Sequence, residues 1–129
     1  MSQQNIQTIQ NLYTVFFRQD LPTILALTSP DIHIEQSPEL PWGGTYHGHA
    51  GLQQFFSALR THLENRALPI DRYLDSGTHV IAIGRTQGLI RANGKPFDVP
   101  LAHVWELKDG KAISFRPFID NPTMKKCLE

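Results

Sequence analysis

The chain has 129 residues, of which 40% are hydrophobic, and its 12 lysines and arginines balance 12 aspartates and glutamates. This length and apolar content can bury one core, so we expect a single domain spanning residues 1–129. A neutral chain has no basic field for phosphate groups, which argues against nucleic acid as a partner. The single cysteine, Cys127, has no internal disulfide partner, and this favours a cytoplasmic location. Neither a signal sequence nor an apolar segment long enough to span a bilayer is evident, so we expect a soluble protein with no membrane partner.

Two helices are predicted at the start of the chain. Apolar residues recur there at three- and four-residue steps, which places them on one helix face: Ile6, Ile9, Tyr13, Phe16 and Phe17. Asp20 is a suitable N-cap for a second helix, whose first turn tolerates Pro22. Ser29-Pro30 should end that helix.

A short strand, a glycine-rich connection and a third helix follow. Ile32 and Ile34 alternate with polar residues, as in a half-buried strand. The connection from Pro41 to Gly48 carries Trp42 and Tyr46. The next helix is predicted from an apolar stripe: Leu52, Phe55, Phe56, Leu59 and Leu63.

The second half of the chain has the pattern of strands throughout. We place them at four segments: Leu68 to Leu74, His79 to Arg91, Pro96 to Leu107 and Lys111 to Asp120. Asn93-Gly94 and Asp109-Gly110 supply the positive φ values that tight hairpins need, so these strands should form an antiparallel meander. Helices followed by strands predict an α+β fold, with the helices covering one face of a curved sheet.

Several short motifs occur in the order seen in a known family. They are Asp20-Leu21, Gly44-Thr45-Tyr46-His47-Gly48, His103-Val104-Trp105 and Arg116-Pro117-Phe118-Ile119-Asp120. Over nearly its whole length the chain resembles the SnoaL-like, nuclear transport factor 2-like superfamily, which includes ketosteroid isomerase, polyketide cyclases and limonene epoxide hydrolase. The resemblance implies a cone-shaped roll of three helices on a curved, mostly antiparallel sheet. It also implies a homodimer formed through the outer sheet surface, for which we expect the small-residue face of Val80, Ala82, Gly84 and Thr86.

The resemblance to ketosteroid isomerase can be carried over one residue at a time. Its general base falls on Gln36, which cannot take a proton, and its tyrosine donor falls on Leu12. Tyr13 is one residue away, about 100° around the helix, so this donor is predicted to be missing. The protonated aspartic acid of that enzyme falls on His103. In the epoxide hydrolase an acidic residue follows an arginine in the last strand, whereas here Pro117 follows the arginine.

His103 is the principal catalytic candidate. It shares a strand face with Leu101 and Trp105 and should therefore be buried among apolar side chains. In a functional site it would donate or accept a proton, or polarise a ligand carbonyl. The alternative is a core histidine that hydrogen-bonds a backbone carbonyl or a tyrosine hydroxyl.

Glu35 and Asp120 are weaker catalytic candidates. Glu35 alternates with buried Ile34, so it is expected to face solvent unless its side chain turns inward. Asp120 ends the last predicted strand, where the alternative to a catalytic role is an ion pair with Arg116 or a neighbouring strand.

Aromatic and apolar side chains are the predicted ligand contacts. Trp42 and Tyr46 are expected at the mouth of a pocket, or as plugs at the wide end of the core. The remaining predicted contacts lie on the inner faces of the elements above: Tyr13, Phe16, Phe56, Leu101 and Trp105. A place in the core explains Phe16 and Phe56 better than specific binding does.

No metal or cofactor is expected. His47 and His49 are two residues apart, but the sequence places no third ligand beside them. Phosphate-binding loops and nucleophile motifs are also not evident. We therefore expect a protein that binds a small apolar or carbonyl-bearing molecule, acting as a cofactor-free isomerase, cyclase or hydrolase through acid-base chemistry. The alternative is a non-catalytic ligand-binding or dimeric interaction module of the same fold.

Overall fold

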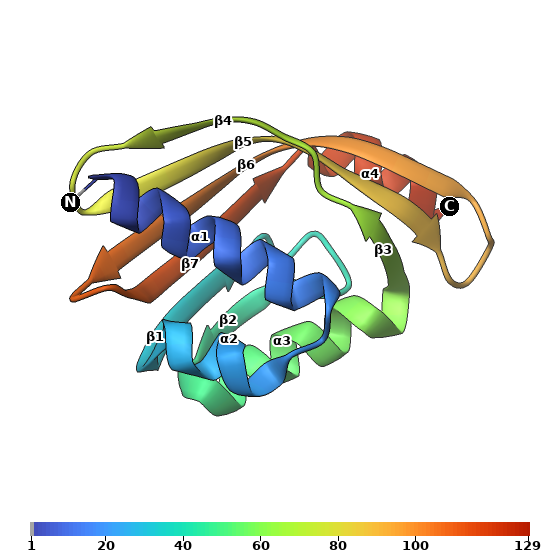
Figure 1. The fold of residues 1–129 in the computed structure, drawn as a ribbon. Helices are drawn as coiled ribbons and strands as arrows, with labels where there is room; N and C mark the ends of the chain where they lie inside the picture. Colours follow the sequence, from blue (N-terminus) through green and yellow to red (C-terminus); the bar gives the residue numbers. More distant parts are fainter. Residues whose placement is uncertain (1) are drawn as a thin grey trace.

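The computed structural model describes residues 2–129 as four helices and one seven-stranded sheet (Figure 1). The helices are α1 (Ser2–Phe17), α2 (Leu21–Leu27), α3 (Gly48–His62) and α4 (Asn121–Leu128). The strands are β1 (Thr28–Gln36), β2 (Gly44–His47), β3 (Leu63–Ala67), β4 (Ile70–Asp75), β5 (His79–Ile90), β6 (Pro96–Lys108) and β7 (Lys111–Ile119). Among the described residues, no helix combines the length and apolarity needed to cross a membrane.

The sheet has the strand order β2-β1-β7-β6-β5-β3, and β4 also pairs with β5. All pairings are antiparallel except that of β1 with β7. Figure 1 shows that the sheet curls strongly around α1, while α2 and α3 lie beneath the opening of the curl. The α+β class and the cone-shaped roll are therefore confirmed, and a fourth helix is added.

The core lies between the concave face of the sheet and the helices. Ile9 of α1, Phe55 of α3 and Val99 of β6 have at most 2% of their surface exposed. Ile32 and Ile34 contribute from β1, as their alternation with polar residues predicted. The helices are thus held in place by their apolar stripes, since burial of such surface is the main stabilising term.

Two glycines allow β3 and β4 to approach β5 closely. A Cβ at Gly84 would collide with the carbonyl oxygen of Pro69, and a Cβ at Gly88 would collide with that of Glu64. The segment predicted as one strand, Leu68 to Leu74, is consequently preceded by a separate strand, and both β3 and β4 pair with β5. This edge closes one side of the roll.

The predicted helix boundaries are close to the observed ones, except that Leu63, predicted on the third helix, begins β3. Asp20 caps α2 by accepting hydrogen bonds from the Thr23 N–H (3.2 Å) and hydroxyl (2.6 Å). The helix ends at Leu27, just before Ser29-Pro30. The Pro41 to Gly48 segment, predicted as a connection, contains β2, whose four-residue length and adjoining glycines concealed its strand character.

Helix α4 was not predicted from the sequence. Its N-cap, Asp120, accepts from the Thr123 N–H (3.2 Å), and Pro122 lies in the first turn. This repeats the Asp-x-Pro-Thr pattern that begins α2 at Asp20. The signal was therefore present, but eight residues at the end of the chain show little apolar periodicity.

Removal of the Asp120 carboxylate tests whether this residue stabilises α4 as its N-cap. Asp120→Ala should lower the free energy of unfolding by about 1 kcal/mol, because the Thr123 N–H loses its acceptor. Urea denaturation of the purified protein measures the change. Lys126→Ala, an exposed position in the same helix, is the control and should have less than half that effect. Equal stability of wild type and Asp120→Ala would show that the cap does not hold α4.

Candidate functional site

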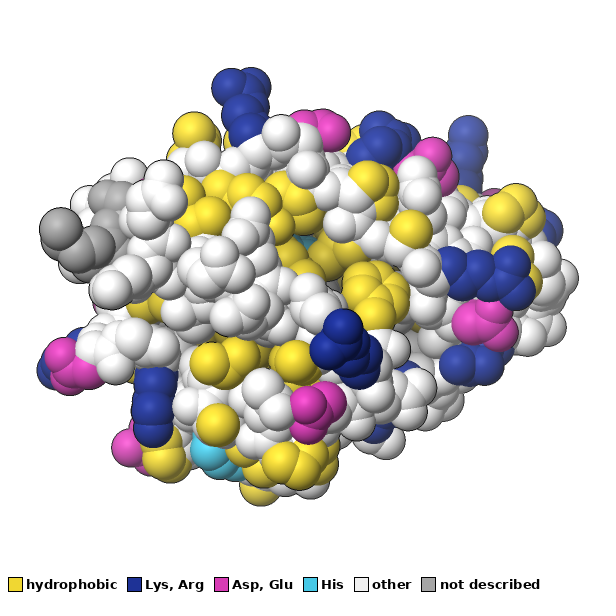
Figure 2. Space-filling model, viewed as in Figure 1, with side chains coloured by type: hydrophobic (Ala, Val, Ile, Leu, Met, Phe, Trp, Pro, Cys, Tyr) yellow, Lys and Arg dark blue, Asp and Glu magenta, His cyan; other side chains and the backbone are white. Residues whose placement is uncertain are grey.

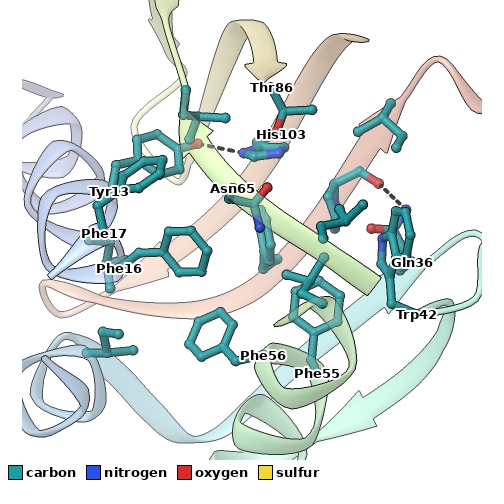
Figure 3. Close-up of a pocket in the computed structure, with 18 of the residues that line it drawn as sticks. Tyr13, Phe16, Phe17, Gln36, Trp42, Phe55, Phe56, Asn65, Thr86 and His103 are labelled. Atoms are coloured by element: carbon teal, nitrogen blue, oxygen red, sulfur yellow. Dashed lines mark hydrogen bonds between the residues drawn. The ribbon is translucent and has the colours of Figure 1, made fainter. Parts of the chain in front are cut away.

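A cavity of about 100 Å³ lies between α1, α3 and the concave face of the sheet. Its wall is almost entirely apolar, with aromatic side chains from helices and strands (Figure 3). Figure 2 shows the hollow from outside, ringed by hydrophobic side chains and with histidine atoms at its base. The histidine that lines the cavity is His103. For comparison, a cavity of about 150 Å³ in another protein holds benzene, so this space is on the scale of one small ring.

Three polar side chains form a hydrogen-bonded chain at the base of the cavity. The Trp105 indole N–H donates to the Tyr13 oxygen at 3.0 Å, and the Tyr13 oxygen lies 2.9 Å from Nδ1 of His103. Tyr13 comes from α1, whereas the other two residues are neighbours on one face of β6. The chain therefore ties the first helix to the middle of the sheet.

The Trp105 indole N–H can only donate, so the Tyr13 oxygen accepts from it. The roles of the Tyr13 hydroxyl and His103 Nδ1 depend on the tautomer of the imidazole. When the Tyr13 hydroxyl donates to Nδ1, a neutral ring carries its proton on Nε2. Nε2 has no hydrogen-bond partner among residues 2–129, so in this tautomer the cavity receives an unused N–H donor.

Burial keeps both rings neutral. Removal from water lowers the pKa of His103 from its ordinary value to about 3. Burial also raises the pKa of Tyr13, although the hydrogen bond from Trp105 acts in the opposite direction. At neutral pH the site therefore presents an uncharged imidazole as a hydrogen-bond donor rather than an imidazolium acid.

Three further polar side chains line the cavity. Asn65 of β3 and Thr86 of β5 point into it (Figure 3), and neither side chain has a hydrogen-bond partner in the described part of the chain. Gln36, the last residue of β1, donates from Nε2 to the Pro117 carbonyl at 3.4 Å. These residues were not predicted as contacts. The alternation along β5 could have indicated Thr86, which shares the face of Val80 and Ala82.

Neither acidic candidate reaches the cavity. Glu35 faces outward from β1, where Arg116 Nη2 lies 3.3 Å and His33 Nε2 lies 3.4 Å from its carboxylate. Asp120 caps α4 and makes no ion pair with Arg116, which pairs with Glu35 instead. Within residues 2–129, no aspartate or glutamate lines the cavity.

The predicted mouth of the pocket is wrong. Trp42 lines the cavity but is only 1% exposed, so it belongs to the closed interior. Tyr46 lies outside the lining and donates its hydroxyl proton to the Trp42 carbonyl at 3.0 Å. The exposed lining residue is Phe17, at 39%, which places the opening at the end of α1. The Pro41 to Gly48 segment forms wall rather than entrance because its aromatic side chains fold back onto α3 and the core.

The other predicted contacts divide into two groups. Tyr13, Phe16, Phe56 and Trp105 line the cavity, as does His103. Leu101 is buried in the β5–β6–β7 ladder but lies outside the lining. Both Leu12 and Tyr13 line the cavity, but the Tyr13 hydroxyl is hydrogen-bonded to Trp105 and His103.

The face expected to form the dimer surface is instead the inner face of β5. Val80 and Ala82 have 0% exposure because they pair with Trp105 and His103 over the core, and Thr86 lines the cavity. The alternation along β5 correctly grouped these residues on one face, but their small size was taken to indicate the outer surface. They are small because they pack beside large residues of β6. The outward face carries Ile81 and Ile83.

The paired histidines of the β2–α3 junction have separate environments. His47 lies opposite His33 in the β1–β2 ladder. His49 Nε2 lies 3.1 Å from the Thr28 carbonyl oxygen, which attaches α3 to β1. In the described part of the chain, no three residues among histidine, cysteine, aspartate and glutamate lie together in a geometry for a metal ion.

The fold and cavity define a class: an α+β roll with an apolar cavity between its helices and its sheet. Residues 9–115 match the model of the SnoaL-like domain, and the chain belongs to this family. An NTF2-like protein of unknown function from Burkholderia pseudomallei is 32% identical, with 99% of this chain and 98% of that chain covered and a TM-score of 0.89. TerC, crystallised with polyporic acid, is 26% identical over 97% of this chain and 98% of its own, with a TM-score of 0.86. A search of curated proteins finds no match.

The pH dependence of stability tests the state of His103. Its folded pKa of about 3 lies below the unfolded value of about 6.5, so the unfolded chain binds the proton more tightly. The contribution to stability is complete above pH 6.5 and is lost as the pH falls toward 3. As the pH falls from 6 to 4.5, His103 should lower the free energy of unfolding by about 1.4 kcal/mol for each pH unit.

Urea denaturation across this range measures the slope. His103→Gln should flatten it by about that amount, whereas His79→Gln, at an exposed histidine on β5, should retain the wild-type slope. A wild-type slope that His103→Gln leaves unchanged would show that His103 is not buried in the neutral form.

Proposed function

We propose that this protein binds a small, mainly apolar molecule through a carbonyl or similar oxygen, which accepts a hydrogen bond from Nε2–H of His103. The observation that carries the proposal is the Trp105–Tyr13–His103 chain, because it leaves one directed donor in an apolar cavity. Burial in such surroundings strengthens a hydrogen bond to a ligand and penalises a ligand that leaves the donor unpaired.

Binding without turnover is the form of this function that the site favours. A cofactor-free isomerase, cyclase or hydrolase working by acid-base chemistry needs a group that takes a proton near neutral pH. Burial lowers the pKa of His103 too far for that role, and the described cavity wall contains no carboxylate. Catalysis would then be limited to polarisation of a ligand oxygen by the neutral imidazole. TerC was crystallised with an organic acid, and its likeness to this chain supports a small-molecule site.

A pair of isosteric probes tests the proposed hydrogen bond. Acetophenone carries a carbonyl where α-methylstyrene carries a CH₂ group, and each has one ring for the cavity. His103→Phe should weaken acetophenone binding about tenfold, since one buried hydrogen bond is lost, and should change α-methylstyrene binding less than twofold. NMR titration of the ¹⁵N-labelled protein measures both affinities.

The melting temperature and the ¹⁵N spectrum of His103→Phe show whether this variant is folded. Equal weakening of the two probes would mean that His103 shapes the cavity without contacting an oxygen. Failure of wild type to bind either probe at millimolar concentration would contradict the small-molecule function itself.

We further propose a homodimer in the cytoplasm, formed through the outward face of the sheet. An apolar stripe crosses four strands there, with Leu74 and Phe118 46% and 50% exposed at its ends. Ladder pairings join its members: Leu74, Ile81, Val104, Ile83, Ala102 and Phe118. Two of the bordering arginines are paired within the chain, Arg85 with Asp98 at 2.6 Å and Arg116 with Glu35 at 3.3 Å, which reduces the repulsion that a second copy would meet. Apolar patches of this kind typically mark protein interfaces.

The outward face is tested by placing a charge in the stripe. Phe118→Asp should convert the dimer to a monomer, because the carboxylate would be buried without a partner. Multi-angle light scattering at about 50 μM measures the mass. Phe17→Asp, an exposed aromatic residue on α1, is the control and should remain dimeric. A wild-type protein that is monomeric at this concentration would refute the dimer.

A further inference from the structure

A surface groove adjoins the cavity at the end of α1. It has a volume of about 450 Å³ and lies between the α1–α2 turn and α3. Phe16 and Phe56, which face one another in Figure 3 with ring centroids 5.4 Å apart, line both the cavity and the groove. Ile24 of α2 also lines both. The cavity and the groove therefore share a wall of apolar side chains.

The α3 side of the groove is polar and carries one positive charge. Gln53, Ser57 and Arg60 share one face of α3 at four- and three-residue spacing, and all three line the groove. Arg60 forms no ion pair within residues 2–129, whereas four of the other arginines do. The carboxylate of Asp20, in the α1–α2 turn, is bound to Thr23 instead. The charge of Arg60 is thus left for a group from outside this part of the chain.

Gln19 lines the groove from a backbone conformation that favours glycine. It follows α1 with a φ of 54°, and the N–H groups of Gln19 and Asp20 donate to the carbonyls of Phe16 (3.1 Å) and Val15 (3.0 Å). These bonds form a Schellman motif, whose left-handed position is usually glycine because a Cβ is strained there. The strained position supplies an amide that glycine would lack, which favours a binding role for the groove.

The two adjoining spaces differ in the ligand groups they suit. The cavity wall has neither lysine nor arginine, so a carboxylate would be buried there without a partner. In the groove a guanidinium and two amides offer N–H donors, and arginine commonly binds a carboxylate through two hydrogen bonds.

We propose that the groove binds the carboxylate of an amphipathic organic acid, with Arg60, Gln19 and Gln53 as its donors, while the apolar end of the same molecule occupies the cavity. The placement of the apolar end rests on the proposed function. The carboxylate site itself is outside the cavity and does not involve His103.

Phenylalkanoic acids and their amides test the carboxylate site, since the members of each pair differ mainly in charge. Phenylacetate, 4-phenylbutyrate and 6-phenylhexanoate are compared with the corresponding amides at about pH 7 by isothermal titration calorimetry. At least one of the two longer acids should bind about tenfold more tightly than its amide, because its carboxylate reaches Arg60. Phenylacetate should bind more weakly than its amide, because its short chain would draw the charge into the apolar cavity.

Substitution of Arg60 identifies the source of the gain. Arg60→Gln should reduce the advantage of the longer acid to less than about twofold and leave the affinity for its amide within about twofold of wild type. Arg72→Gln is the matched control and should retain the advantage, since Arg72 is also exposed and unpaired within residues 2–129 but lies on β4, outside the groove. Equal losses in both variants would show a general effect of net charge and overturn the carboxylate site.

Gln19→Gly separates binding from folding. Glycine relieves the strain at this position, so the melting temperature should rise by about 2–4 °C, while the longer acid should lose about threefold in affinity through the missing amide. A lower melting temperature with unchanged affinity would show that the Gln19 side chain serves the fold rather than a ligand.

The outcomes separate this inference from the proposed function. If the longer amides bind but their acids gain nothing, or if the gain survives in Arg60→Gln, the carboxylate site is refuted and small-molecule binding in the cavity stands. If neither the acids nor the amides bind, the inference is refuted. Acetophenone binding and its dependence on His103 then decide the proposed function independently.

Discussion

The hydrogen-bonded chain from Trp105 through Tyr13 to His103 is the interaction on which the site depends. It joins α1 to the centre of β6 inside an otherwise apolar cavity, where hydrogen bonds are strong and unpaired groups are costly. By fixing the rotation of α1 it also directs Phe16 and Phe17 toward the cavity and its opening. The same contact that attaches α1 to β6 engages Nδ1 of His103 and leaves Nε2 as the ring nitrogen available to the cavity.

Burial accounts for both the shape of the chamber and its chemistry. The apolar wall that excludes water also holds His103 neutral, because the charged ring would lose its hydration. Carboxylates that could have restored the charge lie elsewhere: Glu35 is on the outer face of β1 and Asp120 caps α4. The geometry therefore favours recognition of an oxygen acceptor over transfer of a proton.

Periodicity in the sequence was sufficient to predict most of the fold and the position of His103. The two faces of β5 were also separated correctly, but alternation alone cannot say which face is inside. That depends on the pairing of Val80 and Ala82 with the large residues of β6, which is a tertiary fact. The same limit applies to Trp42, whose aromatic ring suits an entrance or an interior equally well until α3 packs beside it.

Comparison with the ketosteroid isomerase pattern explains how one cavity can serve a different role. That enzyme pairs a general base with a neutral acid that donates a hydrogen bond to the developing oxyanion. At the corresponding positions this chain has Gln36, whose amide is engaged with the Pro117 carbonyl, and His103 in a neutral, donating state. The donor half of the arrangement is retained in a different residue, while the base half is replaced by a group that cannot accept a proton. A ligand oxygen would still be bound and polarised, but the step that consumes the bound molecule would lack its base.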